Sequence, residues 1–342
     1  MESQSLDDGQ GGQLQFPNEI HKFQTLNGKP IDDLELASRI AKFESIIVHH
    51  QRLKDLLQAV KDCHLLQISS VNKKGMSIFG DPGVGKSTIF KLYEAMFPRT
   101  TGQKMFRGQM CKFKKIPVLR VELESNSKPI NVASKMLEKL GDPLYYKGTE
   151  KELTSRLKEY LSGCEVEIII IDELQHLIDT DTLRVISKAA DWLKQLINEI
   201  NLPIVFGGVE SASNIFLHNE QLGSRFPERH IYQPFDYEDP ESIKKFRAYV
   251  KNIEKELPLS GKSKLYDPYL CEKIYYATKG YPRFLNHLLY HSLRIALRSG
   301  KDLIDENDLN LGFSKLQFDN RPKIKNPFNG KAFNLSAALN AE

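Results

Sequence analysis

The sequence lacks several features that would place it outside the ordinary soluble class. Its four cysteines, Cys63, Cys111, Cys164 and Cys271, stand far apart, which argues against a metal site and fits buried thiols in a reducing compartment. No run approaches the ~18 apolar residues of a membrane span, and the acidic opening MESQSLDDGQ is unlike a signal peptide. We therefore expect a cytoplasmic protein with no membrane partner.

Excess charge of either sign is also missing. The 48 basic and 44 acidic side chains leave a formal net charge of +4, so any affinity for nucleic acid must come from local clusters of cations. The 342 residues are 40% hydrophobic, which is ordinary for a globular chain long enough for about two domains. Composition excludes fibrous and disordered chains, and function has to be inferred from motifs.

The strongest motif occupies residues 80–88. It consists of Gly80, Asp81, Pro82, Gly83, Val84, Gly85, Lys86, Ser87 and Thr88, the spacing of a P-loop. Its glycines let backbone N–H groups approach a triphosphate, Lys86 is predicted to reach the β- and γ-phosphates, and Ser87 to hold Mg²⁺. Glycine-rich turns are common, so the flanks decide: an apolar strand (76–79) precedes the motif, and a helix (87–97) follows it.

A second motif follows an apolar run at residues 168–171. Four consecutive isoleucines are too few for a helix and are typical of a central parallel strand buried on both faces. Asp172 and Glu173 end the run. Two acids can simply cap a following helix, but downstream of a P-loop Asp172 is predicted to bind Mg²⁺ and Glu173 to activate the attacking water. The two motifs together predict an ATPase that binds ATP and Mg²⁺.

Positive charge gathers between the P-loop helix and the next strand. The cations that we consider for DNA binding are Arg99, Lys104, Arg107, Lys112, Lys114 and Lys115, with Lys128 beyond the strand at 116–123. Such a cluster can be only a solvated loop. Placed between helix and strand, it is predicted to project as a hairpin and to neutralise DNA phosphates without regard to sequence.

The chain divides by pattern into four segments. Residues 1–33 read as a flexible leader, 34–236 as an α/β ATPase core, 237–313 as a helical lid, and 314–342 as a tail. The core is expected to be a parallel sheet with flanking helices, because strand and helix patterns alternate up to residue 236 and only helical patterns follow.

Taken in order, Lys86, Asp172, Glu173, Arg225 and Arg283 resemble the functional set of an AAA+ ATPase. The resemblance implies a three-layer P-loop core with a helical lid. It also implies that Arg225 is an arginine finger acting on a neighbouring copy, and that Arg283 is the second sensor on the lid. A lone arginine is otherwise most often part of a surface salt bridge.

More narrowly, residues 35–312 resemble the transposition regulators of the TnsC and TniB group. The similarity is carried by the stretches IDELQHL (171–177), LPIV (202–205), EQLGSRF (220–226) and LPL (257–259). It implies an oligomeric ring or filament on double-stranded DNA that recruits a transposase, answers to a target-selection adaptor and is reset by ATP hydrolysis. Some members of this group serve CRISPR-associated transposons.

One departure from the family pattern concerns the first sensor. Where a polar residue is usual after the fourth strand, this chain has Gly208 and Val209, then Glu210. Hydrolysis is therefore expected to be slow, unless Glu210 substitutes. His176 either couples a partner to the site or is simply packed.

Three rival functions remain at this point. An origin-recognition or helicase-loading ATPase usually carries a winged helix after the lid, for which the residues after Phe313 are too few. A switch ATPase that binds only protein would not need the basic cluster. A metabolic kinase would need neither the acid pair nor Arg225.

Overall fold

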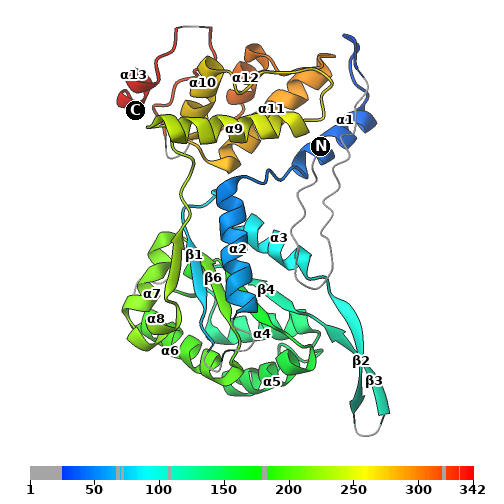
Figure 1. The fold of residues 1–342 in the computed structure, drawn as a ribbon, viewed down its shortest axis with the longest axis vertical. Helices are drawn as coiled ribbons and strands as arrows, with labels where there is room; N and C mark the ends of the chain where they lie inside the picture. The colour runs from blue at the N-terminus through cyan, green and yellow to red at the C-terminus, as the bar shows by residue number, and fades with distance from the viewer. Residues whose placement is uncertain are drawn as a thin grey trace. The chain divides into compact units, whose positions relative to one another are not determined.

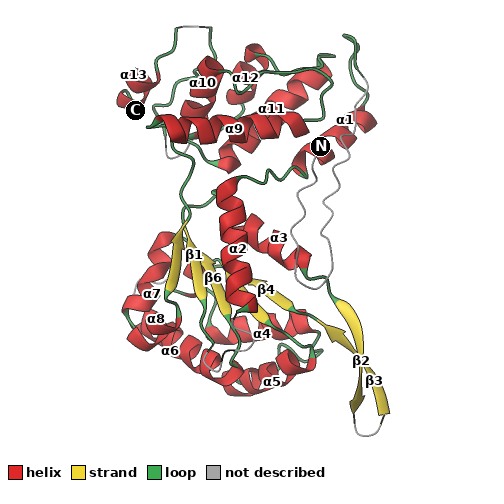
Figure 2. Ribbon diagram, in the orientation of Figure 1, coloured by secondary structure: helices red, strands yellow, loops and turns green. Residues whose placement is uncertain are grey.

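The computed structural model describes residues 25–66, 70, 73–106, 109–178, 183–317, 321–330 and 332–342. These residues form two compact units, shown in Figure 1 by position in the chain and in Figure 2 by secondary structure. The α/β unit comprises residues 49–235 together with 281–283. The helical unit comprises residues 25–48, 236–280 and 284–342. Residues 1–24 of the predicted leader lie outside the described residues.

A five-stranded parallel sheet forms the centre of the α/β unit. Its strands are β1 (Met76–Phe79), β4 (Val118–Glu122), β5 (Ile168–Asp172), β6 (Ile204–Gly208) and β7 (Glu228–Ile231). They lie in the order β4-β5-β6-β1-β7, and each neighbouring pair runs parallel. The predicted α/β class is confirmed, and β6 separates the P-loop strand from the strand that ends in the acid pair.

Helices cover both faces of this sheet. They are α2 (Gln51–Leu65), α3 (Lys86–Met96), α4 (Pro129–Leu140), α5 (Glu150–Gly163), α6 (Leu183–Ile200), α7 (Asn214–Leu217) and α8 (Glu220–Arg225). All four isoleucines of β5 are fully buried, because consecutive side chains of a strand point to opposite faces and each face here has its own helical layer. Ile168 and Ile170 pack with α2 and α3, whereas Ile169 and Ile171 pack with α4 to α8.

An antiparallel hairpin interrupts the alternation of strands and helices after α3. Its strands are β2 (Thr100–Phe106) and β3 (Gln109–Lys115), with Thr100 opposite Lys115 and Phe106 opposite Gln109. The hairpin expected from the basic cluster is therefore present, and Figure 1 shows it projecting from the α/β unit as a two-stranded arm. Because β3 ends just before β4 begins, the arm leaves the unit at the amino end of β4.

The helical unit holds α1 (Asp33–Glu44), α9 (Pro240–Glu256), α10 (Pro268–Thr278), most of α11 (Pro282–Arg298), α12 (Glu306–Phe313) and α13 (Leu335–Asn340). Buried Arg39 explains why α1 belongs here rather than with the core, where the sequence division at residue 34 placed it: its guanidinium donates to the Pro258 carbonyl at 3.2 Å. In the part of the chain that the structure describes, no helix combines the length and apolarity needed to cross a bilayer.

Residues 321–342 differ from the tail that their composition suggests. The Arg321 guanidinium donates to the carbonyls of Tyr276 at 2.8 Å and Ala277 at 3.1 Å, near the end of α10. Phe328 is 2% exposed and its ring lies 6.2 Å from that of Phe313. Single buried aromatics without helical or strand periodicity leave no pattern, which is why this packing was not predicted.

Candidate nucleotide site and basic hairpin

Parallel topology brings three loops together at the carboxyl ends of the central strands. The P-loop follows β1, Asp172 ends β5, and Gly208 ends β6. Phe79 stands opposite Gly208 and Ile171 opposite Phe206 in the sheet register. Ligands of open α/β sheets bind outside this edge, so the topology alone assembles the two predicted motifs into one candidate site.

The P-loop has the backbone that a phosphate cradle requires. Gly83 and Gly85 have φ angles of 90° and 109°, in the left-handed region that glycine adopts without strain. Gly85 caps α3, so the first N–H groups of that helix open toward the loop. Thr88 donates its N–H back to the Gly85 carbonyl at 3.1 Å. The predicted residues 80–88 thus form a tight turn at a helix N-terminus, a geometry suited to an anion.

Lys86 is held inside this turn. Its Nζ donates to the carbonyl oxygens of Gly80 at 2.7 Å and Asp81 at 2.9 Å, and the residue is 5% exposed. Burial lowers the pKa of Lys86, and the nearby Glu173, Asp172 and Asp81 oppose that shift. A buried cation among acids and carbonyls is placed to meet the charge of a bound phosphate.

Asp172 is fully buried and only partly satisfied. Its Oδ1 accepts the Glu173 N–H at 2.9 Å, whereas Oδ2 has no hydrogen-bond partner among the described residues. Burial raises the pKa of Asp172, and the Ser87 hydroxyl opposes this effect. A buried carboxylate oxygen without a partner, next to a hydroxyl, fits a Mg²⁺ site, because hard cations prefer oxygen ligands and compensate buried negative charge.

Glu173 stands in an unusual backbone conformation. Its φ is 60° and its ψ is 43°, which is left-handed and costs energy for a residue with a side chain. The strain turns the chain sharply from β5 into the short 3₁₀ helix η1 (Leu174–Leu177). Its carboxylate accepts a hydrogen bond from Gln175, a residue that the sequence analysis did not single out. His176 is half-buried, and its backbone N–H donates to the Glu173 carbonyl at 3.0 Å.

Arg283 reaches the P-loop through its own backbone. Its N–H donates to the Gly83 carbonyl at 3.2 Å, and a Cβ on Gly83 would lie 2.9 Å from the Arg283 Cβ. Two residues earlier, the Tyr281 hydroxyl donates to Asp81 Oδ2 at 2.6 Å. This is why residues 281–283 group with the α/β unit. The structure therefore brings Arg283 and the P-loop together, across about 200 residues of sequence that no local pattern connects.

Arg225 lies at the opposite edge of the sheet. Its carbonyl accepts the N–H of Gly75, the residue before β1, at 2.8 Å, and its guanidinium donates to Asn198 Oδ1 at 2.7 Å. The P-loop begins where β1 ends, so the length of that strand separates the Arg225 backbone from the chain's own phosphate cradle. Arg225 is not part of the site that its own chain assembles.

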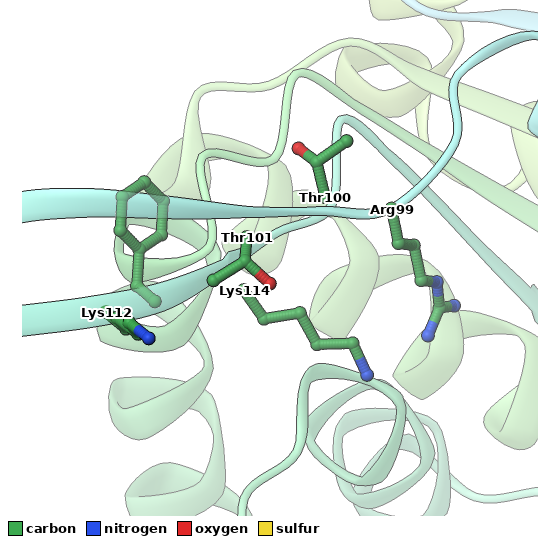
Figure 3. Close-up of a pocket in the computed structure, with 6 residues that line it drawn as sticks. Arg99, Thr100, Thr101, Lys112 and Lys114 are labelled. Atoms are coloured by element: carbon green, nitrogen blue, oxygen red, sulfur yellow. The ribbon is translucent and has the colours of Figure 1, made fainter.

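The basic hairpin has two unequal faces. Side chains alternate along a strand, and the cross-strand register puts Thr101 with Lys114 and Gln103 with Lys112 on one face, where all four are exposed. Lys112 and Lys114 make no ion pair within the described residues. With Arg99, Thr100, Thr101 and Phe113 they line an open cavity of about 320 Å³ (Figure 3). In that view the Arg99 and Lys114 side chains extend on the same side of the strands.

The other face is tied to the core. Lys104 donates to the Gly163 carbonyl at 3.1 Å and lies 4.5 Å from the centre of the Phe113 ring. Lys115 Nζ lies 3.2 Å from a carboxylate oxygen of Glu165. Among the remaining predicted DNA contacts, Arg107 lies outside the described residues. Exposed Lys128 precedes α4 at the carboxyl end of β4, away from the hairpin.

A P-loop after β1 and an acid pair after β5, with β6 between them in a parallel sheet, define a P-loop ATPase of the AAA+ class. Solved structures support that class. The chain is 15% identical to Cdc6p from Pyrobaculum aerophilum, with a TM-score of 0.58 over 84% of this chain and 72% of that one. It is also 15% identical to the Aeropyrum pernix ORC1 protein in complex with DNA, with a TM-score of 0.55 over 81% of this chain and 69% of that one.

The family is narrower than the class. The family model described as "Bacterial TniB protein" matches residues 39–234, more than half of the chain, and the protein belongs to this family. No curated protein matches the sequence. The resemblance to TniB-type AAA+ ATPases seen in the motifs is confirmed, and the protein is an ATPase of that family.

Proposed function

We propose that this protein is an ATP-dependent regulator of transposition that assembles on double-stranded DNA, recruits a transposase and is reset by hydrolysis. Its family supports the link to transposition. The observation that carries the DNA-binding part is the exposed face of the hairpin, where Lys112 and Lys114 stand without an in-chain partner in the described structure. By the same family argument, a target-selection adaptor would be a further partner.

Hydrolysis in this proposal follows from the site geometry. The P-loop N–H groups and Lys86 bind the phosphates, and Glu173 takes a proton from the attacking water. Ser87 and Asp172 would hold Mg²⁺, which would neutralise charge on the β- and γ-phosphates. Arg283 follows the nucleotide through its contact with Gly83. Positioning and charge neutralisation supply most of the rate acceleration in phosphoryl transfer, and these groups provide both for ATP hydrolysis.

Arg225 makes the active form an assembly. Its backbone lies at the amino edge of β1, away from the phosphate cradle of its own chain. In this proposal Arg225 therefore acts on the nucleotide of a neighbouring copy. An arginine finger supplied by a second molecule is an established way to complete a nucleotide site. ATP binding and subunit contact are then coupled, because each neighbour completes the other's site.

DNA binding in this proposal is electrostatic. Lys112 and Lys114 present cations on one side of the hairpin, and the Thr101 hydroxyl between them can bind a phosphate oxygen. Arg99 on the same side is shared with Glu94, whose carboxylate oxygen lies 3.6 Å from its guanidinium. Lys104 and Lys115 hold the hairpin to the core instead. The ORC1 protein of Aeropyrum pernix, which has a similar fold, was solved in complex with DNA, and this supports the proposal of a nucleic-acid partner.

The test is binding to non-specific duplex DNA across a salt series, with a non-hydrolysable ATP analogue and then ADP, reading complex size by sedimentation. Wild-type protein should form large, salt-sensitive complexes with the analogue only. The double variant K112E/K114E should lose at least tenfold in affinity, and its salt slope should fall by about two because each phosphate contact contributes about one. Basal ATPase activity should stay unchanged.

The charge-matched control is K151E/K188E, which reverses two exposed lysines on α5 and α6. If both double variants lose the same affinity, overall charge rather than the hairpin binds DNA, and the assignment is wrong. If wild-type protein binds no DNA with either nucleotide, the rival function applies: an AAA+ switch that acts on protein partners without direct DNA contact.

A further inference from the structure

Gln175 bridges two loops at the carboxyl edge of the sheet. Its Nε2 donates to the Glu173 carboxylate, and its Oε1 accepts the N–H of Val209, just after β6, at 3.1 Å. These two bonds fix the orientation of the carboxamide, because only the oxygen can accept the N–H and only the NH₂ group can donate to the carboxylate. Gln175 is half-buried, and both of its hydrogen-bonding ends are used.

The glycine pair at the end of β6 leaves space for this bridge. A Cβ on Gly208 would lie 2.9 Å from Gln175 Oε1, and a Cβ on Gly207 would lie 2.8 Å from Asp172 Oδ1. A side chain at position 208 would displace the Gln175 carboxamide, whereas a Cβ at position 207 would first meet the Phe90 ring, at 2.3 Å. The absence of a polar side chain after β6, which in the sequence looked like a missing sensor, is therefore the condition for Gln175 to occupy that space.

We propose that Gln175 is a positioning residue for Glu173 and performs, from η1, the task that a polar side chain after β6 would otherwise perform. This inference rests on the proposed role of Glu173 as the base. Glu173 starts from a strained left-handed backbone and is exposed enough to change rotamer. A charge-assisted hydrogen bond from an amide that is itself anchored to the Val209 backbone selects one orientation of the carboxylate. Exposed Glu210 begins η2 (Glu210–Ser213) and is not needed for this task.

The bridge also connects the end of β6 to the base. Any movement of the Val209 peptide is transmitted through one side chain to the Glu173 carboxylate. The site therefore senses the β6 loop through the Val209 backbone N–H rather than through a side chain of that loop.

The experiment compares Q175M and Q175E with wild-type protein. Methionine keeps nearly the same length and removes both hydrogen bonds. Glutamate keeps an acceptor for Val209 but presents a negative charge to Glu173. Each variant should lower kcat about 10- to 100-fold, as expected when a reacting group is misplaced by about 1 Å. Affinity for a fluorescent ATP analogue and melting temperature should stay within twofold and about 2 °C of wild type, which a structural defect would not allow.

Three further variants extend the comparison. Q58M is the matched control, because Gln58 is an exposed glutamine whose Nε2 also donates to a carboxylate, that of Asp62 at 2.8 Å; its kcat should equal that of wild type. G208A should push the Gln175 carboxamide aside and reproduce the loss in kcat. The double variant G208A/Q175M should lose no more than the more severe single variant, since both act on one bridge.

Unchanged kcat in Q175M, or a loss of kcat matched by equal losses of nucleotide affinity and melting temperature, would overturn the proposal. Additive losses in G208A/Q175M would do the same. The variant E173Q separates this inference from the function on which it rests. If E173Q remains active, Glu173 is not the base. If E173Q is inactive while Q175M is fully active, only the role of Gln175 is wrong.

Discussion

Lysine side chains are buried at one edge of the central sheet and exposed at the other. At the carboxyl edge Lys86 is buried and bonded to two carbonyls, and acids surround it. At the amino edge Lys112 and Lys114 are exposed and have no ion-pair partner in the described chain. A buried cation held by two hydrogen bonds is fixed before its ligand arrives, and its field is strong in a low-dielectric site. Exposed cations are screened and act mainly by releasing counterions from a polyanion.

In the proposed function, the carboxyl edge carries out ATP hydrolysis and the hairpin at the amino edge binds DNA. Substitutions at the carboxyl edge that leave ATP binding intact should change the rate of hydrolysis without weakening DNA binding, whereas substitutions on the hairpin should change DNA affinity at a constant rate of hydrolysis. Arg225 belongs to neither group, because it stands at the amino edge and is proposed to act on the carboxyl edge of another copy. The predictions below test this separation, beginning with the largest expected effect.

Removing the proposed base should have the largest effect on rate. E173Q should lower kcat by about 10²- to 10⁴-fold, the usual contribution of a general base, while ATP still binds. Assemblies formed on DNA with ATP should then persist, which sedimentation over time can follow. E210Q is the control, because Glu210 is the other acid near the end of β6 and is exposed. Rapid release of E173Q from DNA would show that hydrolysis at this site does not reset the protein.

Variants of Arg225 test whether the amino edge of one copy contacts the nucleotide site at the carboxyl edge of another copy. R225A should lower ATPase activity by about 10²-fold or more, because an arginine finger stabilises transition-state charge. K86A should be inactive for a different reason, namely loss of phosphate binding. An equimolar mixture of the two variants should regain activity that neither has alone, since each supplies what the other lacks. If the mixture is inactive at concentrations where wild-type protein assembles, Arg225 does not complete the nucleotide site of a neighbouring copy.

The smallest expected effect is a loss of stability at acidic pH, caused by His50. Burial lowers the pKa of His50 to about 4 from an ordinary 6.5, while Nδ1 accepts the Leu53 N–H at 3.3 Å to cap α2. As pH falls, the imidazole of the unfolded chain is therefore protonated before that of the folded chain. The contribution of neutral His50 to the free energy of unfolding is complete above pH 6.5 and is lost progressively toward pH 4. Allowing for partial solvent screening, His50 should cost on the order of 1–2 kcal/mol between pH 7 and pH 5.

The variant H50N checks this prediction, because asparagine retains a cap acceptor and does not titrate. Urea unfolding at pH 7 and pH 5 should show a smaller pH difference for H50N than for wild type. An equal difference in both proteins would assign the acid sensitivity to other groups.

Local patterns predicted the parts of the molecule that local forces build. The P-loop, the isoleucine strand and the hairpin were all expected, because each depends on spacing within a dozen residues. The pairing of Tyr281 with Asp81, by contrast, joins residues 200 positions apart within the α/β unit, and no periodicity encodes such a contact. Gln175 was missed because an amide two residues after the acid pair has no motif of its own, although the glycine pair at the end of β6 was a visible signal.

The hairpin shows the same limit at smaller scale. Its six cations looked equivalent in the sequence, but strand register and contact with Gly163 and Glu165 decide which of them face solvent. The buried aromatics after residue 320 also lacked a pattern, since Phe328 packs singly. The roles assigned to individual site residues stay predictions until the variants are measured.

The position of β1 in the sheet has a consequence for biosynthesis. This strand is the first of the sheet in the chain, yet both of its neighbours, β6 and β7, come late, between Ile204 and Ile231. During synthesis the backbone groups of β1 and its apolar Met76 and Ile78 must wait unpaired until those strands emerge. Long-range parallel pairing is slow, and waiting strands are prone to aggregate. Ribosome stalling between residues 80 and 204 should therefore leave nascent chains that depend on chaperones.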